Sequence, residues 1–90
     1  MLVIASYDLK NDKNRKRLHK LLKGYGMPVQ FSVFECILNK RQFKQLYDES
    51  QKFIVDDTDS IIFYKLCDAC QKRISAVYKN KPLSGLTLIV

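Results

Sequence analysis

The sequence predicts an α+β domain, and three observations point to this fold class. Residues 2–8 are apolar almost throughout, which is typical of a short strand buried on both faces. Residues 27–38 and 60–66 are rich in branched and aromatic side chains, which favours further strands. Two segments between these strands repeat apolar residues at helical spacing. This order matches a ferredoxin-like βαββαβ fold, in which two helices cover one face of an antiparallel sheet.

The apolar run of residues 2–8 ends in Tyr7 and Asp8. The first strand is therefore expected to place a carboxylate at the edge of the sheet. A helix is then expected to about position 24, starting from Asn11 or Asp12, since either side chain can cap free backbone N–H groups. The apolar face of this helix consists of Leu18, Leu21, Leu22 and Tyr25.

Two glycines and a long strand-like segment follow the first helix. Gly24 and Gly26 are expected to take the left-handed backbone conformations that end a helix. Residues 27–38 form either one bent strand or two strands joined by a very tight turn, and the sequence leaves both alternatives open.

The second helix is expected to begin after Asn39, because Gln42 three residues later completes a capping box. Ser50 interrupts an apolar face that consists of Phe43, Leu46, Tyr47, Phe53 and Ile54. A turn follows the helix, and we interpret its aspartates as structural groups that cap and bend the backbone; they are Asp56, Asp57 and Asp59. Residues 60–66 are expected to be the next buried strand.

The C-terminal part exceeds what a ferredoxin-like domain needs. Residues 74–78 are expected to form a further strand, and residues 86–90 a last apolar strand. An exposed apolar strand invites aggregation, so we expect it to pair, most naturally by completing a sheet across a dimer interface. The 90 residues make one domain, with residues 1–78 as its core and residues 79–90 as a tail strand at that interface.

The charge balance indicates a polyanionic partner. Lys and Arg number 16 against nine acids, which gives a net charge of +7. The N-terminus lacks the features of a secretory signal, and no apolar run is long enough to span a membrane, so no membrane association is expected. Three cysteines, an odd number, fit a reducing compartment better than a disulfide framework, and a cytoplasmic protein is expected.

The number and spacing of the cysteines and of the single histidine argue against a metal site, a redox pair or catalysis by histidine. Cys67 and Cys70 have the spacing of a zinc knuckle or a redox pair, but only Cys36 and His19 could complete a metal site. We interpret the pair as structural cysteines in a tight turn, because no helix start is evident nearby to lower the pKa of a thiol. A metal-free ribonuclease usually needs a general acid and a general base, and the single His19 supplies only one of them. Because the apolar face of its helix is formed by Leu18, Leu21 and Leu22, we interpret His19 as a solvated surface residue.

Asp8 is the carboxylate that remains as a candidate for catalysis. It ends a buried strand and is followed by a basic helix. One carboxylate holds Mg²⁺ poorly alone, whereas two Asp8 side chains brought together by a two-fold axis would make a shared site. The structural alternative is that Asp8 caps the following turn together with Asn11.

Several motifs resemble those of one family, the CRISPR-associated endoribonuclease 2 family, whose members are small nucleases that partner the spacer integrase. The resemblance covers most of the chain. It is carried by Tyr7-Asp8, Arg15-x-Arg17, Tyr25-Gly26, Gln30-Phe31-Ser32-Val33-Phe34-Glu35-Cys36, and Asp59-Ser60-Ile61-Ile62-Phe63-Tyr64 leading to Leu66-Cys67. The run from Gln30 is the most specific. Met27 and Pro28 depart from the family, in which many members carry a basic residue shortly before this run.

The resemblance implies a homodimer with exchanged C-terminal strands and a metal-dependent phosphodiesterase. Its Mg²⁺, or Mn²⁺ as an alternative, would be bound by Asp8 from both subunits. It also implies a place in the spacer-acquisition complex, where the protein binds duplex DNA and bridges dimers of the CRISPR spacer integrase. The cleaved substrate could be DNA or single-stranded RNA.

The basic helix supplies the expected contacts to nucleic acid, which are Lys13, Arg15, Lys16, Arg17 and Lys20. Arg15 and Arg17 lie two residues apart, so at most one of them is expected to point at the metal. Tyr7 and Phe34 are expected to support the site, and Phe34 alternatively to stack on a base. Two other functions stay open: a non-catalytic scaffold that binds DNA, and a toxin-type RNA-cleaving relative of the same fold.

Overall fold

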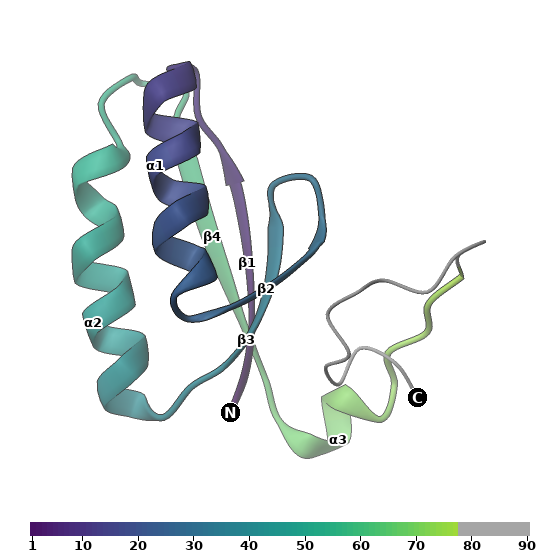
Figure 1. The fold of residues 1–90 in the computed structure, drawn as a ribbon. Coiled ribbons are helices and arrows are strands. Elements are labelled where there is room, and N and C mark those ends of the chain that lie inside the picture. Colours follow the sequence, from purple (N-terminus) through teal and green to yellow (C-terminus); the bar gives the residue numbers. More distant parts are fainter. Residues whose placement is uncertain (78–90) are drawn as a thin grey trace.

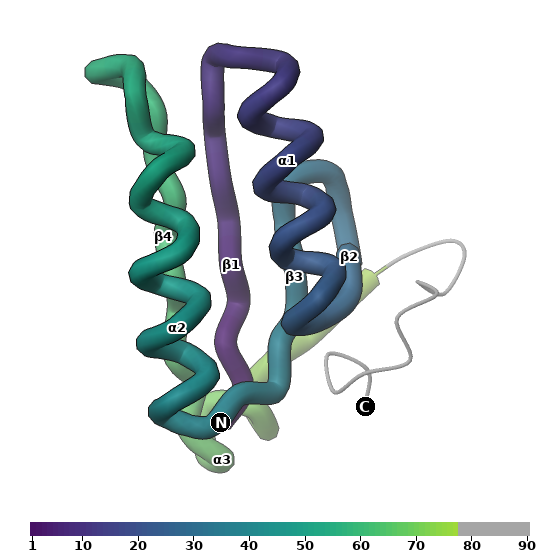
Figure 2. The backbone as a smooth tube through the Cα atoms, turned by 60° about the vertical axis from the view of Figure 1, so that its left-hand side comes forward, coloured from purple at the N-terminus to yellow at the C-terminus, as the bar shows by residue number. Residues whose placement is uncertain are grey.

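The computed structural model describes residues 1–77, and these form the predicted ferredoxin-like fold (Figure 1). Its elements are β1 (Leu2–Asp8), α1 (Asp12–Lys23), β2 (Gly26–Gln30), β3 (Val33–Ile37), α2 (Lys40–Ser50), the 3₁₀ turn η1 (Gln51–Phe53), β4 (Ser60–Leu66) and α3 (Asp68–Gln71). The strands form one antiparallel sheet in the order β2-β3-β1-β4. Helices α1 and α2 both lie on one side of it (Figures 1 and 2).

Strand β1 is the centre of the molecule, because it pairs with β3 on one side and β4 on the other. Its residues alternate between the two faces of the sheet. Val3, Ala5 and Tyr7 belong to the core beneath the helices, together with Leu18 and Leu22 of α1. Helices α1 and α2 do not cover the opposite face, on which Leu2 and Glu35 are nevertheless buried, whereas Ile37, Ile62 and Tyr64 are about half exposed (Figure 1).

The strand-like segment after α1 is two strands, so the alternative with a tight turn is correct. Phe31 and Ser32 connect β2 to β3, and Ser32 takes a positive φ of 60°. The expected left-handed glycines are wrong, since Gly24 caps α1 with a right-handed φ of −75° and Gly26 does not take a positive φ. Gly26 is required for a different reason: a Cβ atom there would lie 2.3 Å from the Glu35 carbonyl oxygen on β3.

The predicted helix caps are confirmed. Asn11 is the N-cap of α1, and its side chain accepts a hydrogen bond from the Asn14 amide. Asn39 and Gln42 form the capping box of α2. Ser50, the polar residue on the apolar face, is buried and donates its hydroxyl hydrogen bond to the Tyr47 carbonyl, so its burial leaves the hydroxyl satisfied.

The apolar face of α2 is only partly as predicted. Leu46 and Phe53 are buried, and Phe43 packs edge-on against Phe63 of β4. Tyr47 and Ile54, by contrast, are nearly half exposed, although the Tyr47 ring still packs against Phe43 and Phe63. None of the described helices is both long enough and apolar enough to cross a membrane.

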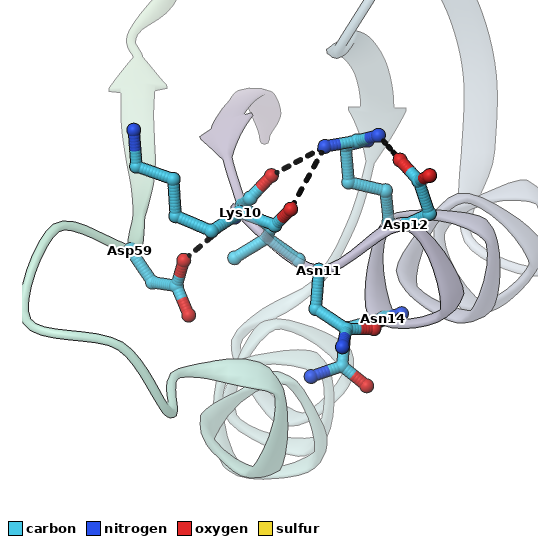
Figure 3. A network of polar contacts seen from close by, with 7 residues as sticks. Lys10, Asn11, Asp12, Asn14 and Asp59 are labelled. Carbon is cyan, nitrogen blue, oxygen red and sulfur yellow. Dashed lines mark hydrogen bonds and ion pairs between the residues drawn. The ribbon is translucent and has the colours of Figure 1, made fainter.

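Two of the three aspartates between α2 and β4, Asp56 and Asp59, shape the backbone as predicted, whereas the Asp57 side chain bonds to no described residue. The Asp59 carboxylate accepts hydrogen bonds from the amides of Lys10, Val55 and Asp56, and Figure 3 shows the bond to Lys10. Asp56 accepts from both the amide and the hydroxyl of Thr58. Hydrogen bonds to the charged carboxylate hold the pKa of Asp59 below its usual value.

Asp59→Asn is expected to destabilise the fold at pH 7. A lowered carboxyl pKa in the folded state stabilises the protein above the unfolded pKa, about 4, and this contribution disappears as pH falls through the folded pKa. Urea unfolding should therefore give a lower midpoint for the variant at pH 7 and a smaller difference at pH 3. Asp57→Asn is the matched control, since that side chain bonds to no described residue. An equal loss in both variants would refute the assigned role.

The structure departs from the prediction after β4. Residues 60–66 form a strand, but it lies at the sheet edge with Ile62 and Tyr64 about half exposed, so it is not the fully buried strand expected. A one-turn helix, α3, replaces the tight turn predicted at Cys67 and Cys70. Residues 74–77 are in no strand, which corrects the expectation of a further strand there. Tyr78 and the predicted tail strand, residues 79–90, lie outside the described residues.

Candidate active site and nucleic-acid interface

Asp8 lies exposed at the last position of β1, paired in register with Ser60 of β4. Alternation along the strand places it on the face opposite to Tyr7, and so on the side of the sheet away from α1 and α2. Its carboxylate makes no hydrogen bond or ion pair with any described residue. The alternative role as a turn cap is wrong, because Asn11 alone caps α1. Asp8 is therefore available to a ligand.

Tyr7, His19 and Phe34 form a compact cluster on the helix side of β1. The Tyr7 hydroxyl lies 3.3 Å from His19 Nδ1, and the His19 ring meets Phe34 edge-on with 5.0 Å between centroids. Burial raises the pKa of the Tyr7 phenol, and the opposing effects of Ser32 and Arg15 only reduce this shift. The phenol is thus protonated at neutral pH and acts as a hydrogen-bond donor rather than a nucleophile.

This cluster corrects two expectations. His19 is half-buried against Tyr7 and Phe34, so it is not a freely solvated surface residue. Phe34 is completely buried, and a side chain without exposed surface cannot stack on a base. Its position fits the other expected role, which is to support the end of β1 by packing against Tyr7 at 6.5 Å between ring centroids.

Arg15 is bound to the turn between β1 and α1. Its guanidinium donates hydrogen bonds to the carbonyl oxygens of Leu9, at 2.9 Å, and Lys10, at 3.3 Å, and it forms an ion pair with Asp12. The side chain is nevertheless 43% exposed. Arg15 therefore holds the turn that follows Asp8, and its remaining surface faces a neighbouring groove.

The basic residues of α1 are divided between two grooves. Arg15 and Lys16 line a groove of about 1160 Å³ with Tyr7, His19 and the tip of the β2–β3 hairpin. Arg17 and Lys20 line another, of about 650 Å³, beside Lys52. Neither groove is lined by Asp8, and Lys13 is exposed outside both. The two arginines thus point in different directions, as their two-residue spacing requires.

Replacing each arginine by glutamine should separate structural from binding roles. Arg17→Gln removes an exposed charge that bonds to no described residue. It should leave stability unchanged and lower the slope of log affinity for duplex DNA against log salt by about 0.9 for one lost phosphate contact. Arg15→Gln should instead lower the unfolding free energy by about 1 kcal/mol through its lost hydrogen bonds. Urea unfolding and salt-dependent DNA titration distinguish them, and the reverse pattern would contradict this division.

Metal ligands are sparse within one chain. No group of three or more His, Cys, Asp or Glu side chains that could hold a metal occurs in the described part of the chain. Asp8 offers one free carboxylate, whose hard oxygens suit Mg²⁺ or Mn²⁺. A site there needs further oxygen ligands from outside the chain, such as a second subunit, substrate phosphates or water.

The sequence as a whole matches a known family model. Residues 1–74 match the model of the CRISPR associated protein Cas2. The chain belongs to the Cas2 family. Among curated relatives, the CRISPR-associated endoribonuclease Cas2 1 of Synechocystis sp. is 43% identical, and the match covers 100% of each chain.

Solved Cas2 structures share the fold of this chain. The crystal structure of Streptococcus pyogenes Cas2 is 32% identical, with a TM-score of 0.74 over 87% of this chain and 100% of that one. A chain from a partial Cas6-RT-Cas1–Cas2 complex is 29% identical, with a TM-score of 0.73 over 94% of this chain and 98% of that one. The ferredoxin-like order found here is thus that of the Cas2 family.

Two groove residues of this Cas2 chain were not assigned to the site from the sequence. Lys52 joins Arg17 and Lys20 through the packing of η1 beside α1, and no local pattern indicates that contact. His19 does have a local signal, because it follows Arg15 by four residues and therefore lies on the same helical face. Both residues line the grooves that contain the basic side chains of α1.

Proposed function

We propose that this Cas2 protein is a metal-dependent endonuclease that works as a homodimer, with Mg²⁺ or Mn²⁺ held by Asp8 of both subunits. One observation carries the proposal: the carboxylate at the end of the central strand is exposed and bonds to no described residue. A carboxylate at the edge of a sheet that bonds to no described residue can bind a divalent ion without first breaking a bond in the described fold. The names of the relatives as endoribonucleases support the phosphodiesterase activity.

Exposed apolar side chains on the sheet face opposite α1 and α2 support the homodimer. Residues opposite each other on neighbouring strands share a face, so the register places Ile37, Ile62 and Tyr64 on the side opposite to the core. These three side chains are each about half exposed. An exposed apolar surface of this kind marks an interaction site. A second copy of the same face would cover it and bring the two Asp8 side chains to a common two-fold axis.

Residues on the two faces of the sheet near the end of β1 suit phosphate chemistry. A bound divalent ion supplies Lewis-acid stabilisation of the phosphate and promotes ionisation of the attacking water. Asp8 contributes the ligand carboxylates, while Arg15 fixes the turn that follows them. Lys16 and the protonated Tyr7 hydroxyl can donate hydrogen bonds to the phosphates of a strand in the hairpin groove. The proposed substrate is RNA or DNA, which charge alone does not distinguish.

A cleavage panel tests this proposal. Purified protein is incubated with single-stranded RNA and with duplex DNA, in Mg²⁺, in Mn²⁺ and in EDTA. The proposal predicts cleavage of at least one substrate with metal and none in EDTA. Cleavage that survives both EDTA and Asp8→Asn would show that the proposed metal site is wrong.

A second function is favoured by the basic groove that Asp8 does not line. Arg17, Lys20 and Lys52 gather there without any carboxylate, which suits binding of duplex DNA rather than hydrolysis. The net charge of +7 would be doubled in a dimer. We therefore also propose a scaffold role, in which the dimer binds DNA and bridges dimers of the spacer integrase, as suggested by the Cas1–Cas2 complex among the similar structures. Spacer acquisition with Asp8→Asn tests it: normal acquisition without cleavage favours the scaffold.

A further inference from the structure

Two cysteines face each other where the chain leaves the sheet. Cys67 follows the last residue of β4, and Cys70 lies one turn later in α3. Their Sγ atoms are 3.4 Å apart, and both residues are exposed. The register pairs Leu66 with Leu2 and Ser60 with Asp8, so the thiols lie at the opposite end of the sheet from Asp8. The length of β4 separates them by about 20 Å.

The surroundings of the two thiols are unequal. The Cys67 thiolate is stabilised by the backbone amide of Cys70, by the Cys70 thiol, which donates to it once Cys67 is ionised, and by the amide of Ala69, and these interactions lower the pKa of Cys67. The Cys67 thiolate next to it raises the pKa of Cys70 in turn. The sequence-based interpretation placed both cysteines in a tight turn; the structure places them at the start of the single turn α3, where the two thiols face each other.

We propose that Cys67 and Cys70 are a reversible dithiol–disulfide pair in which Cys67 reacts first. The geometry carries this assignment, because two exposed sulfur atoms already in contact can be joined with little movement of the backbone. Exposure gives a soluble oxidant access to both. The assignment is independent of the nuclease and scaffold proposals, since neither uses these residues.

The oxidant is a low-molecular-weight disulfide such as glutathione disulfide, and the reaction is thiol–disulfide exchange. The Cys67 thiolate attacks one sulfur of the oxidant, which breaks its S–S bond and releases one thiolate. Cys70 then loses its proton to water and attacks the Cys67 sulfur of the mixed disulfide, releasing the second thiol. Two protein thiols are oxidised by two electrons, and one external disulfide is reduced to two thiols.

Cys36 is a control within the same chain. It lies fully buried on β3, and burial raises its pKa to about 11. A buried, protonated thiol reacts slowly with both disulfides and alkylating agents. Modification of Cys36 in the native protein would therefore report unfolding, while its protection shows that reactions at Cys67 and Cys70 occur in the folded state.

The test follows native, reduced protein exposed to glutathione disulfide, with intact mass and peptide mapping after an acid quench. Wild-type protein should lose two hydrogens, form a bond between Cys67 and Cys70, and leave Cys36 free. Cys70→Ser should accumulate one glutathione on Cys67, because the resolving thiol is missing. Cys67→Ser should gain glutathione on Cys70 about tenfold more slowly.

A second measurement needs no substitution. Brief alkylation of wild-type protein with iodoacetamide at pH 7 should label Cys67 about tenfold faster than Cys70. Equal rates at the two thiols would overturn the assignment of Cys67 as the attacking group. Wild-type protein that carries two glutathiones without an internal bond, or that forms only bonds between chains, would overturn the pair itself.

Discussion

Asp8→Asn is expected to abolish metal-dependent cleavage, with a loss of more than about 100-fold. The reason is that loss of even an outer-shell partner of a metal typically costs about 10–100-fold, and Asp8 is proposed to contact the ion itself. Asparagine keeps the size of the side chain but removes the negative charge from both halves of a shared site. Initial cleavage rates in saturating Mg²⁺ measure the effect.

The control for Asp8→Asn is Asp57→Asn, which makes the same charge change at another exposed aspartate without hydrogen bonds to described residues. It should cleave like the wild type. Urea unfolding should also show that Asp8→Asn is as stable as the wild type, since its carboxylate bonds to nothing in the described fold. A variant that still cleaves within threefold of the wild-type rate would contradict the role of Asp8 as a ligand.

Phe34→Ala is expected to lower the free energy of unfolding by about 3–5 kcal/mol, the range for removing a fully buried aromatic ring. The cavity would open between Tyr7 and His19, the two rings that Phe34 contacts. Such a loss is a large part of the stability of a small domain. Urea denaturation followed by circular dichroism measures it, and the 37 °C cleavage rate should fall with the folded fraction.

Phe34→Leu and Phe31→Ala complete this experiment. Leucine fills most of the volume, so Phe34→Leu should lose less stability than Phe34→Ala and bind nucleic acid normally. Phe31 is fully exposed at the hairpin tip, and Phe31→Ala should leave stability unchanged. If the folded Phe34→Leu protein lost affinity for nucleic acid, Phe34 would touch the ligand after all, contrary to its burial.

Local signals were enough to predict much of this fold. Asn11 caps α1, and the capping box of Asn39 and Gln42 starts α2, because side chains within three residues satisfy the first amides of each helix. The apolar run of β1 likewise specifies a central strand. The sequence did not decide between one bent strand and a hairpin. The hairpin turn contains Ser32, which takes a positive φ, and this conformation is uncommon for a residue other than glycine and could not be predicted from the composition.

The sequence-based prediction was weaker for features that depend on tertiary contacts. Asp8 could be singled out because its place at the end of an apolar run is a local property. The burial of Phe34 and the contact between Tyr7 and His19 depend on how α1 packs on the sheet, which periodicity alone does not give. The pairing of Cys67 with Cys70 depended on a single helical turn, α3, too short to leave a periodic pattern.

The central claim is that two copies of Asp8 share one divalent ion, and calorimetric titration with Mn²⁺ tests it most directly. Analytical ultracentrifugation of the same samples establishes the number of chains. The account predicts a dimer that binds one ion per two chains, and no binding at this site by an Asp8→Asn dimer. One ion bound per chain, or undiminished binding by the variant, would contradict the shared site.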